Sequence, residues 1–289
     1  KYAIDKENCI FFEKGKCRAC EKFCPTKAIN FEEKEQKIHL NVGAIVLAPG
    51  FAPYDPTRYQ TYKYAKYPNV VTSMEFERIL SATGPYQGHL QRPSDHKAPK
   101  KIAWLQCIGS RDVHHCDHGY CSSVCCMYAI KEAVIAKEHA GKDLECTIFY
   151  MDMRTHGKDF ERYYNAAKET HGVRFIRSRV PTIEWVQESG DVLIPYVNEK
   201  GEVTEERFDM AVLSVGLEIA PEAVGLAKKL NIELTEGQFC KTDTFDPVKT
   251  SREGIFVCGA FQGPKDIPQS VIEASSAAAE AGALLSGAR

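Results

Sequence analysis

The sequence lacks any apolar run that approaches the roughly 18 to 20 residues of a membrane-spanning helix. It also lacks an excess of charge, because 37 Lys and Arg residues are balanced by 39 Asp and Glu residues, a formal net charge of −2. Such a balance gives neither the basic stripe that binds nucleic acid nor a single-sign field for a membrane surface. We therefore expect no nucleic-acid partner and no membrane span.

A start methionine and a signal-peptide core are both missing from the first residues, Lys1 to Asp5. We expect either a mature product or a piece of a longer chain. The length of 289 residues is enough for two domains, each with a core of its own. The phosphate-binding pattern G-x-G-x-x-G is also absent from the whole sequence.

Cysteine, by contrast, is abundant. Nine of the twelve cysteines fall into two groups, one from Cys9 to Cys24 and one from Cys107 to Cys126. In a chain without an export signal, such groups indicate metal ligands or redox groups before disulfides. We expect a reducing, cytoplasmic location, and we expect the remaining Cys146, Cys240 and Cys258 to be small buried hydrophobic residues.

The first group has the spacing C-x7-C-x2-C-x3-C-P, formed by Cys9, Cys17, Cys20, Cys24 and Pro25. Its end matches the end of the bacterial ferredoxin run C-x2-C-x2-C-x3-C-P, which favours an iron–sulfur cluster. Zinc is the alternative metal, although zinc sites usually contain two C-x2-C pairs and only one is present; plain core cysteines are the third interpretation. The pattern leaves open whether Cys24 serves this cluster or a neighbouring one.

Apolar patterning predicts an α/β protein with a parallel sheet. A continuous apolar run over 42–48, followed by Pro49 and Gly50, is typical of a strand buried on both faces. From residue 101 onward, strands and helices alternate as a βαβαβ unit. The predicted strands of this unit are 101–107, 144–151 and 173–177, and its predicted helices are 124–139 and 158–170.

The flanking segments are predicted with less regular structure. Residues 57–98 are expected to form a linker and surface excursion with one helix at 73–81. Strands at 182–188, 192–198 and 202–208 are expected to form an antiparallel meander before a buried strand at 210–217. The other predictions are short strands at 28–31 and 37–40, a helix and irregular connection over 221–250, a strand at 254–261 and a helix at 269–286.

The second cysteine group occupies the position at which dinucleotide-binding folds place their phosphate loop. Cys107 ends a predicted strand, and Cys121, Cys125 and Cys126 surround the start of the next helix, which Ser122 or Ser123 can cap. Free amides in the first turn favour an anion there. The spacing C-x13-C-x3-C-C leaves three interpretations: an iron–sulfur cluster, a redox disulfide or buried cysteines.

Histidines accompany this group. His114, His115 and His118, together with Cys116, could ligate zinc, although a polar surface loop is the simpler interpretation. Cys116 is the one cysteine of the group that we do not expect to be a cluster ligand.

A strand, turn and helix near the carboxyl end resemble a flavin-binding junction. The predicted strand delivers Gly259, the chain turns at Gly263 and Pro264, and a helix opens near 268–271. A helix amino terminus aimed at a flavin stabilises the anion that forms on reduction. The alternative is a well-packed terminal helix without a cofactor.

The three segments "NVGAIVLAPGF", "MAVLSVGL" and "GIFVCGA" together resemble the junction strands of flavoproteins with two dinucleotide-binding domains, the thioredoxin reductase-like group. In that group the third strand usually ends in Gly-Asp, whereas this sequence has Gly259-Ala260. The resemblance implies an α/β fold with two dinucleotide-binding domains. The usual aspartate contact to FAD is in doubt.

Two motifs together, "CIGSRD…YCSSVCCMYAIK" and "QGPKDIPQSV", resemble the flavin- and iron–sulfur-carrying subunit of heterodisulfide reductases. The resemblance implies FAD, several [4Fe-4S] clusters and an oxidoreductase that passes electrons within a cytoplasmic complex. It implies as partners the other subunits of the complex, and ferredoxin or hydrogenase-type electron carriers. It also implies that Cys107, Cys121, Cys125 and Cys126 are cluster ligands, and that Lys131 lies near the flavin ring as a catalytic residue.

The resemblance suggests a division of the chain and a cofactor-binding set. The expected divisions are a ferredoxin-like module (1–38), part of the FAD domain plus a linker (39–98), a nucleotide-binding-like domain (99–217) and a return to the FAD domain (218–289). That family's amino-terminal phosphate loop is missing here, so we expect a carboxyl-terminal part that holds FAD weakly or not at all by itself and can be inactive in isolation. The predicted flavin-binding residues are Pro49, Gly50, Gly259, Ala260, Gln262, Gly263, Pro264, Ile267, Pro268, Ser270 and Val271.

Two other functions remain open at this point. One is a non-catalytic module that carries clusters and docks neighbouring subunits. The other is a redox sensor that uses the adjacent Cys125 and Cys126 as a switch.

Overall fold

The computed structural model describes residues 4–34, 36–141 and 143–287. The chain divides into two compact units, Lys1–Val42 and Gly43–Arg289, which we describe separately. Within the described residues, no helix is both long enough and apolar enough to cross a membrane.

The smaller unit contains two helices of one turn or slightly more, α1 (Ile10–Lys14) and α2 (Ala19–Phe23). Among its described residues only Phe31 is buried, and its ring lies 4.4 Å from that of Phe11. The strands predicted at 28–31 and 37–40 are wrong, because neither segment is a strand. Their alternating apolar residues have no partner strand to pack against, and Ile38 and Leu40 are exposed.

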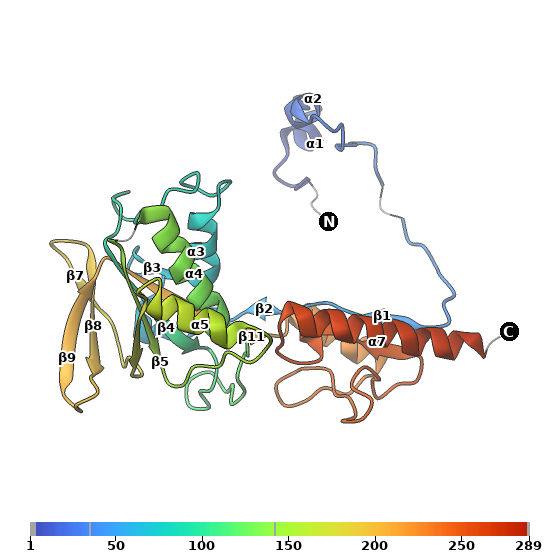
Figure 1. Cartoon of the computed structure of the whole chain (residues 1–289). Helices are drawn as coiled ribbons and strands as arrows, with labels where there is room; N and C mark the ends of the chain where they lie inside the picture. Colours follow the sequence, from blue (N-terminus) through green and yellow to red (C-terminus); the bar gives the residue numbers. More distant parts are fainter. Residues whose placement is uncertain (1–3, 35, 142, 288–289) are drawn as a thin grey trace. The chain divides into compact units, whose positions relative to one another are not determined.

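The larger unit is built around a parallel sheet with the strand order β3-β10-β4-β5-β6 (Figure 1). Helix α4 connects β4 to β5, and α5 connects β5 to β6, so the predicted βαβαβ unit is confirmed. The strands are β3 (Val70–Thr72), β10 (Met210–Val215), β4 (Lys101–Ile108), β5 (Glu145–Tyr150) and β6 (Arg174–Arg177).

The sheet is covered on both faces, and successive residues of β4 point to opposite layers. Ile102 and Trp104 pack with the helices, whereas Ala103 and Leu105 pack with the antiparallel meander β7-β8-β9. The meander predicted from the sequence is therefore confirmed. The covering elements are α3 (Ser73–Leu80), α4 (Cys125–Ala140), α5 (Phe160–Glu169), β7 (Glu184–Val186), β8 (Asp191–Val197) and β9 (Val203–Phe208).

The remaining elements include the two parts of the chain that were predicted to form the flavin junction, one after β1 and one after β12. A parallel pair, β1 and β12, packs with the long helix α7, and the short antiparallel pair β2 and β11 leads to the main sheet. The elements are β1 (Ile45–Leu47), β2 (Ala52–Pro53), η1 (Pro56–Arg58), η2 (Gln60–Tyr62), β11 (Leu217–Glu218), α6 (Pro221–Leu230), β12 (Ile255–Val257), η3 (Gly259–Phe261) and α7 (Ile267–Ser286).

Four sequence predictions in this unit are wrong in part. The strand at 254–261 shortens to β12 and is followed by the 3-10 turn η3. The strand at 42–48 shortens to β1 and is not buried on both faces, because Val46 remains 46% exposed. The segment 57–98 is more than a linker, since it supplies β3 as an edge strand of the main sheet. Neither Ser122 nor Ser123 caps α4, whose N-cap is Val124 without a side-chain cap.

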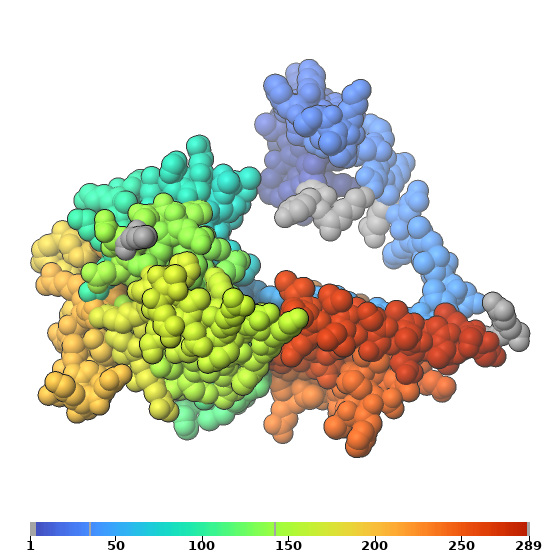
Figure 2. All heavy atoms as spheres, viewed as in Figure 1, coloured from blue at the N-terminus to red at the C-terminus, as the bar shows by residue number. Residues whose placement is uncertain are grey.

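Helix α7 begins with a capping box. The Asp266 carboxylate accepts a hydrogen bond from the Gln269 amide at 2.8 Å, and the Gln269 side chain accepts one from the Asp266 amide at 3.4 Å. The helix runs for 20 residues and lies along the surface of the unit (Figure 2). Its amino terminus is therefore fixed by residues of its own first turn.

Replacing Asp266 with alanine is expected to lower the free energy of unfolding by about 1 kcal/mol, because one first-turn amide loses its acceptor. Asp266→Asn keeps an acceptor and is the matched control, with an expected loss of only a few tenths. Urea denaturation followed by circular dichroism measures both. Equal losses in the two variants would contradict a capping role.

Candidate functional site

The carboxyl end of β4 brings Cys107 out of the sheet. Cys107 has a φ of +63°, an uncommon conformation for a residue with a side chain, and Gly109 follows with a φ of +74°. A Cβ at position 109 would lie 2.1 Å from the Tyr54 ring, so only glycine fits the turn. The strand therefore ends abruptly, at the edge of the sheet where parallel α/β proteins bind ligands.

The loop from β4 to α4 is fastened to the sheet by its serines. The Ser110 and Ser122 hydroxyl groups hydrogen-bond to each other, and Ser122 Oγ also accepts from the Leu217 amide at 2.8 Å. Ser122, predicted as a helix cap, thus holds the loop instead. A Cβ at Gly216 would lie 2.3 Å from Ser110 Oγ, so the neighbouring strand also needs glycine for this close approach.

This loop returns the chain so that four thiols lie close enough to act on one another electrostatically. Cys125 is 3% exposed, and its pKa is raised well above the ordinary value. The largest cause is burial, and repulsion from Cys126, Cys107 and Cys121 adds to it. Burial likewise raises the pKa of Cys126 to about 11. All four residues predicted to ligate the second cluster are therefore gathered at one place.

Cys116 does not belong to this set. Its Sγ donates to the Asp112 carbonyl at 3.1 Å, and its side chain packs beside the sheet core with Tyr54. The same loop holds His115 against the Asp112 carboxylate, with Nδ1 2.8 Å from Oδ2. His118 Nδ1 lies 2.9 Å from the Gly109 carbonyl. These groups serve the fold of the loop, in line with the simpler of the two interpretations given above.

Charged side chains border the four thiols on one side. The Arg111 guanidinium acts electrostatically on Cys107, and the Arg154 guanidinium acts on Cys121. Both donate to the Asp152 carboxylate, Arg154 from Nε at 3.0 Å. Burial acts to raise the pKa of Asp152, but these two hydrogen bonds hold it below the ordinary value.

The donor set fits a thiolate-ligated iron–sulfur cluster. Four thiols near the carboxyl end of β4 lie close enough to interact electrostatically, and guanidinium and amide groups are available to stabilise their negative charge, including the Ser123 amide, 3.3 Å from Cys121 Sγ. All twelve cysteines are free thiols. In the described part of the chain, no group of three or more His, Cys, Asp or Glu residues is arranged to hold a single metal ion.

The cysteines of the smaller unit lie around its two helices, with Cys20 inside α2. Cys9 precedes α1 and Cys24 follows α2, while Cys17 and Cys20 are exposed. Hydrogen bonds from Thr26 and from the Ala28 amide, 3.4 Å from Cys24 Sγ, lower the pKa of Cys24. The geometry leaves the use of Cys24 as open as the spacing did.

At the predicted flavin junction, β12 is followed by the turn η3 and then by α7. The Gly259 amide, with φ +71°, donates to Glu273 Oε2 at 2.9 Å. Glu273 is in turn paired with the buried Lys265, Nζ to Oε1 at 2.6 Å. This network ties the turn to the helix, and a Cβ on Gly259 would lie 3.8 Å from Ser270 Oγ.

The predicted flavin-binding residues lie in three places. Pro49 and Gly50 follow β1, whose partner strand β12 leads directly to Gly259 and Ala260. Gln262, Gly263 and Pro264 form the connection to α7, and Ile267, Pro268, Ser270 and Val271 form its first turns. Ile267 and Val271 are exposed.

Lys131, predicted to be catalytic, lies on the outer side of α4. Its Nζ is 2.9 Å from Glu77 Oε1 of α3, and its side chain is 51% exposed. The next residue, Glu132, points into the core, where Trp104 Nε1 donates to Oε2 at 2.8 Å and Oε1 has no hydrogen-bond partner. Burial raises the pKa of Glu132 well above its ordinary value.

Sequence reasoning missed the charged residues around the thiols and beside Lys131. Arg111 follows the end of β4, and Asp152 and Arg154 follow the end of β5, which pairs with β4. Since the ends of adjacent parallel strands meet at one edge, this arrangement could have been predicted. Glu77 and Glu132 carry no such signal, because only the packing of α3, α4 and β4 brings them to their partners.

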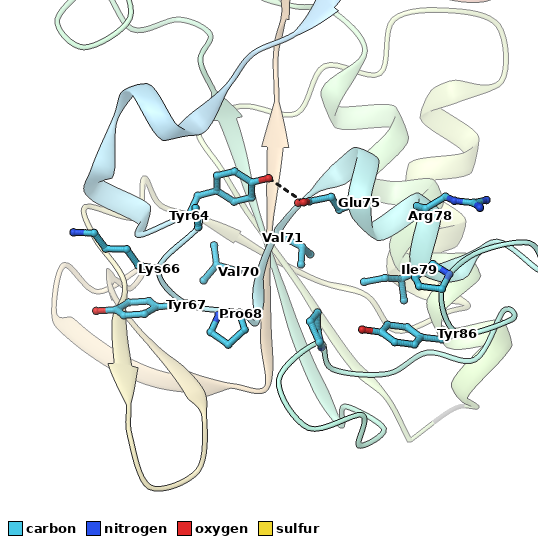
Figure 3. A pocket seen from close by; sticks show the side chains of 13 residues that line it. Tyr64, Lys66, Tyr67, Pro68, Val70, Val71, Glu75, Arg78, Ile79 and Tyr86 are labelled. Atoms are coloured by element: carbon cyan, nitrogen blue, oxygen red, sulfur yellow. Dashed lines mark hydrogen bonds between the residues drawn. The ribbon is translucent and has the colours of Figure 1, made fainter. Parts of the chain in front are cut away.

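A separate surface cavity of about 540 Å³ lies between α3 and the segments before and after it (Figure 3). Tyr64, Tyr67 and Tyr86 line it, and the Tyr64 hydroxyl donates to Glu75 Oε1 at 2.9 Å. None of the residues predicted to bind a cofactor or metal lines this cavity.

Comparison with known proteins gives relatives in two groups. A family model described as pyridine nucleotide-disulphide oxidoreductase matches residues 4–281. The iron-sulfur subunit of the CoB–CoM heterodisulfide reductase of Methanocaldococcus jannaschii is 41% identical over 280 residues, which is 96% of this chain and 42% of the relative. A subunit of the H2:CoB-CoM heterodisulfide, ferredoxin reductase of Methanothermobacter thermautotrophicus is 39% identical over 288 residues, 96% of this chain and 41% of the relative.

Among solved structures, the thioredoxin reductase of Lactococcus lactis has a TM-score of 0.52 at 20% identity, covering 84% of this chain and 66% of its own. The thioredoxin reductase of T. acidophilum has a TM-score of 0.53 at 13% identity, with 82% and 64% covered. At these identities the likeness concerns the fold. The chain spans less than half the length of the two heterodisulfide reductase relatives.

Proposed function

The chain belongs to the pyridine nucleotide-disulphide oxidoreductase family, and we propose that it is the flavin- and cluster-carrying electron-transfer part of a heterodisulfide reductase-type complex. The observation that carries the proposal is the gathering of Cys107, Cys121, Cys125 and Cys126 at the end of β4. In this fold the position normally serves a nucleotide phosphate. A chain that is similar to a heterodisulfide reductase iron-sulfur subunit, and that has four thiols there instead, is suited to passing single electrons.

In this proposal the four thiolates hold a [4Fe-4S] cluster, which accepts and donates one electron at a time. Arg111, Arg154 and the Ser123 amide stabilise the negative charge of the thiolates. The smaller unit is a ferredoxin-like module in which Cys9, Cys17, Cys20 and Cys24 are the ligands of a further cluster. Among its described residues Phe31 alone is buried, and one side chain is too small a core for stability without a metal.

The flavin junction is proposed to hold FAD, which supplies two-electron chemistry when bound. Residues after β1 and after β12 come together there because these strands are paired. The Lys265–Glu273 pair keeps the Gly259 turn against α7, so the helix amino terminus stays directed at the junction. Lys131 is proposed to donate a hydrogen bond to the flavin ring, with Glu77 orienting its ammonium group.

The proposed partners follow from the names of the relatives, which include a heterodisulfide reductase and a heterodisulfide, ferredoxin reductase. We propose that this chain works in the cytoplasm with other subunits of such a complex, and with ferredoxin or hydrogenase-type carriers as electron donors or acceptors. The chemistry on a disulfide substrate is not assigned to this chain.

Anaerobic reconstitution tests the proposal. Purified protein treated with iron and sulfide is expected to retain about eight iron and eight sulfide per chain, the content of two cubanes, and to give a visible spectrum that reduction bleaches. Stoichiometric zinc with no sulfide would overturn the proposal. Flavin is measured separately after denaturation, and we expect less than one FAD per chain.

A further inference from the structure

Three charged side chains that ligate no metal in the proposed function form one hydrogen-bonded unit beside the four thiols. Arg111 and Arg154 donate to the two oxygens of the same carboxylate, Asp152. The sheet explains why they meet: Arg111 follows β4, whereas Asp152 and Arg154 follow the paired strand β5. A single aspartate thereby holds two guanidinium groups in fixed positions.

Each guanidinium also lies close enough to a thiol to act on it electrostatically, Arg111 on Cys107 and Arg154 on Cys121. Cys126 Sγ lies 4.0 Å from the Asp152 carbonyl oxygen. Three of the four thiols therefore lie beside this unit, and the fourth, Cys125, is buried.

The charges of this unit sum to one positive charge, since two guanidinium groups accompany one carboxylate. The side chains of Arg111, Asp152 and Arg154 are 25%, 42% and 33% exposed, so solvent screens them only in part. Four thiolate ligands present negative charge, and reduction of a cluster adds one more. A fixed positive charge close to the thiols stabilises the reduced form of a cluster over the oxidised form.

We propose that Arg111 and Arg154, held in place by Asp152, are positioning residues that raise the reduction potential of the cluster bound by Cys107, Cys121, Cys125 and Cys126. This inference rests on the proposed function, because it requires that these thiols bind a cluster. It goes further by naming the residues that set the direction of electron flow between this cluster and its neighbours.

The test measures the midpoint potential of this cluster alone. In the 289-residue chain with Cys17→Ser and Cys20→Ser, the smaller unit loses two ligands, and the remaining signal belongs to the second cluster. After anaerobic reconstitution, EPR-monitored redox titration is expected to show that Arg154→Gln disfavours reduction about tenfold, a lowering of about 59 mV for one electron. Arg111→Gln is expected to act in the same direction.

The sign of the shift separates a charge effect from general damage. Asp152→Asn removes a negative charge and is expected to favour reduction, opposite to both arginine variants. Arg154→Lys keeps the charge and is expected to restore most of the wild-type potential. The matched control is Arg174→Gln. The Arg174 guanidinium pairs with Glu206 and acts on none of the thiols Cys107, Cys125 and Cys126. This substitution should change the reduction equilibrium of the cluster less than twofold.

Two results would overturn the inference. One is an Arg154→Gln potential whose shift from the unsubstituted background corresponds to less than a twofold change in the reduction equilibrium. The other is a shift of the Asp152→Asn potential in the same direction as that of Arg154→Gln. If Arg154→Gln fails to retain iron, Asp152→Asn decides alone, since its side chain contacts no thiol. Absence of a cluster in the unsubstituted background would instead overturn the proposed function, so the two failures are distinguishable.

Discussion

Replacing Cys125 with alanine is expected to halve the iron of the reconstituted protein, from about eight to about four per chain. Cys125 is the most enclosed of the four thiols, and it interacts electrostatically with the other three. Its loss leaves three ligands at a buried site, where no exposed group can take its place. The sulfide content is expected to fall in the same proportion.

The matched control is Cys116→Ala, which removes a thiol from the same segment but from outside the four-thiol set. It should retain the full iron content. Iron and sulfide analyses, together with circular dichroism to confirm that both variants fold, are the measurements. Equal iron in the Cys125→Ala variant and the wild type would exclude Cys125 as a ligand, and iron loss in Cys116→Ala would place the cluster elsewhere in the loop.

Replacing Glu132 with glutamine is expected to make the stability of the metal-free protein less dependent on pH. Burial raises the folded-state pKa of Glu132 above its value in the unfolded chain. The Trp104 hydrogen bond and the Lys131 charge act to lower this pKa, whereas the Glu77 charge acts to raise it further. Between these two pKa values the folded state binds more protons, so stability falls as pH rises through the window. The fall reaches at most about 1.4 kcal/mol per pH unit, and glutamine, which cannot ionise, abolishes it.

Urea denaturation from about pH 5 to about pH 8 tests this expectation, since the window begins near the unfolded-state value of about 4.3. The free energy of unfolding of Glu132→Gln minus that of the wild type should increase steadily with pH. Glu138→Gln, on the exposed side of the same helix, is the control and should give a constant difference. A constant difference for Glu132→Gln as well would show that Glu132 ionises normally in the folded protein.

The main sheet could be predicted from the sequence because its signals are local. The helix predicted at 73–81 is α3, the strand at 101–107 is β4, and the helix at 124–139 is α4. In each case the apolar period acts within one element. The strands predicted at 28–31 and 37–40 failed because alternation specifies a strand only where a partner and a core exist.

The candidate cysteine ligands of the site could be predicted from the sequence, but the hydrogen bonds around them could not. Cys107 and Cys121 are separated in sequence, yet the βα connection requires that they meet near the start of α4. The position of Ser122, by contrast, depends on Gly216 and Leu217, which lie more than 90 residues further along the chain. The nearness of Arg111 and Asp152 follows from adjacent strand ends, but their hydrogen bond depends on the register between β4 and β5. Such contacts are properties of the assembled sheet, and no local pattern encodes them.

The fastening of the β4–α4 loop has a consequence for the order in which the two thiol sets acquire metal. The Ser110–Ser122 pair, the Leu217 amide and the hydrogen bonds of Asp112 hold this loop without any metal. In the smaller unit only Phe31 is buried among the described residues, so its chain must lose conformational entropy as the metal binds. Under the proposed function, the second set is preorganised for its cluster, whereas metal loading of the first set is coupled to folding.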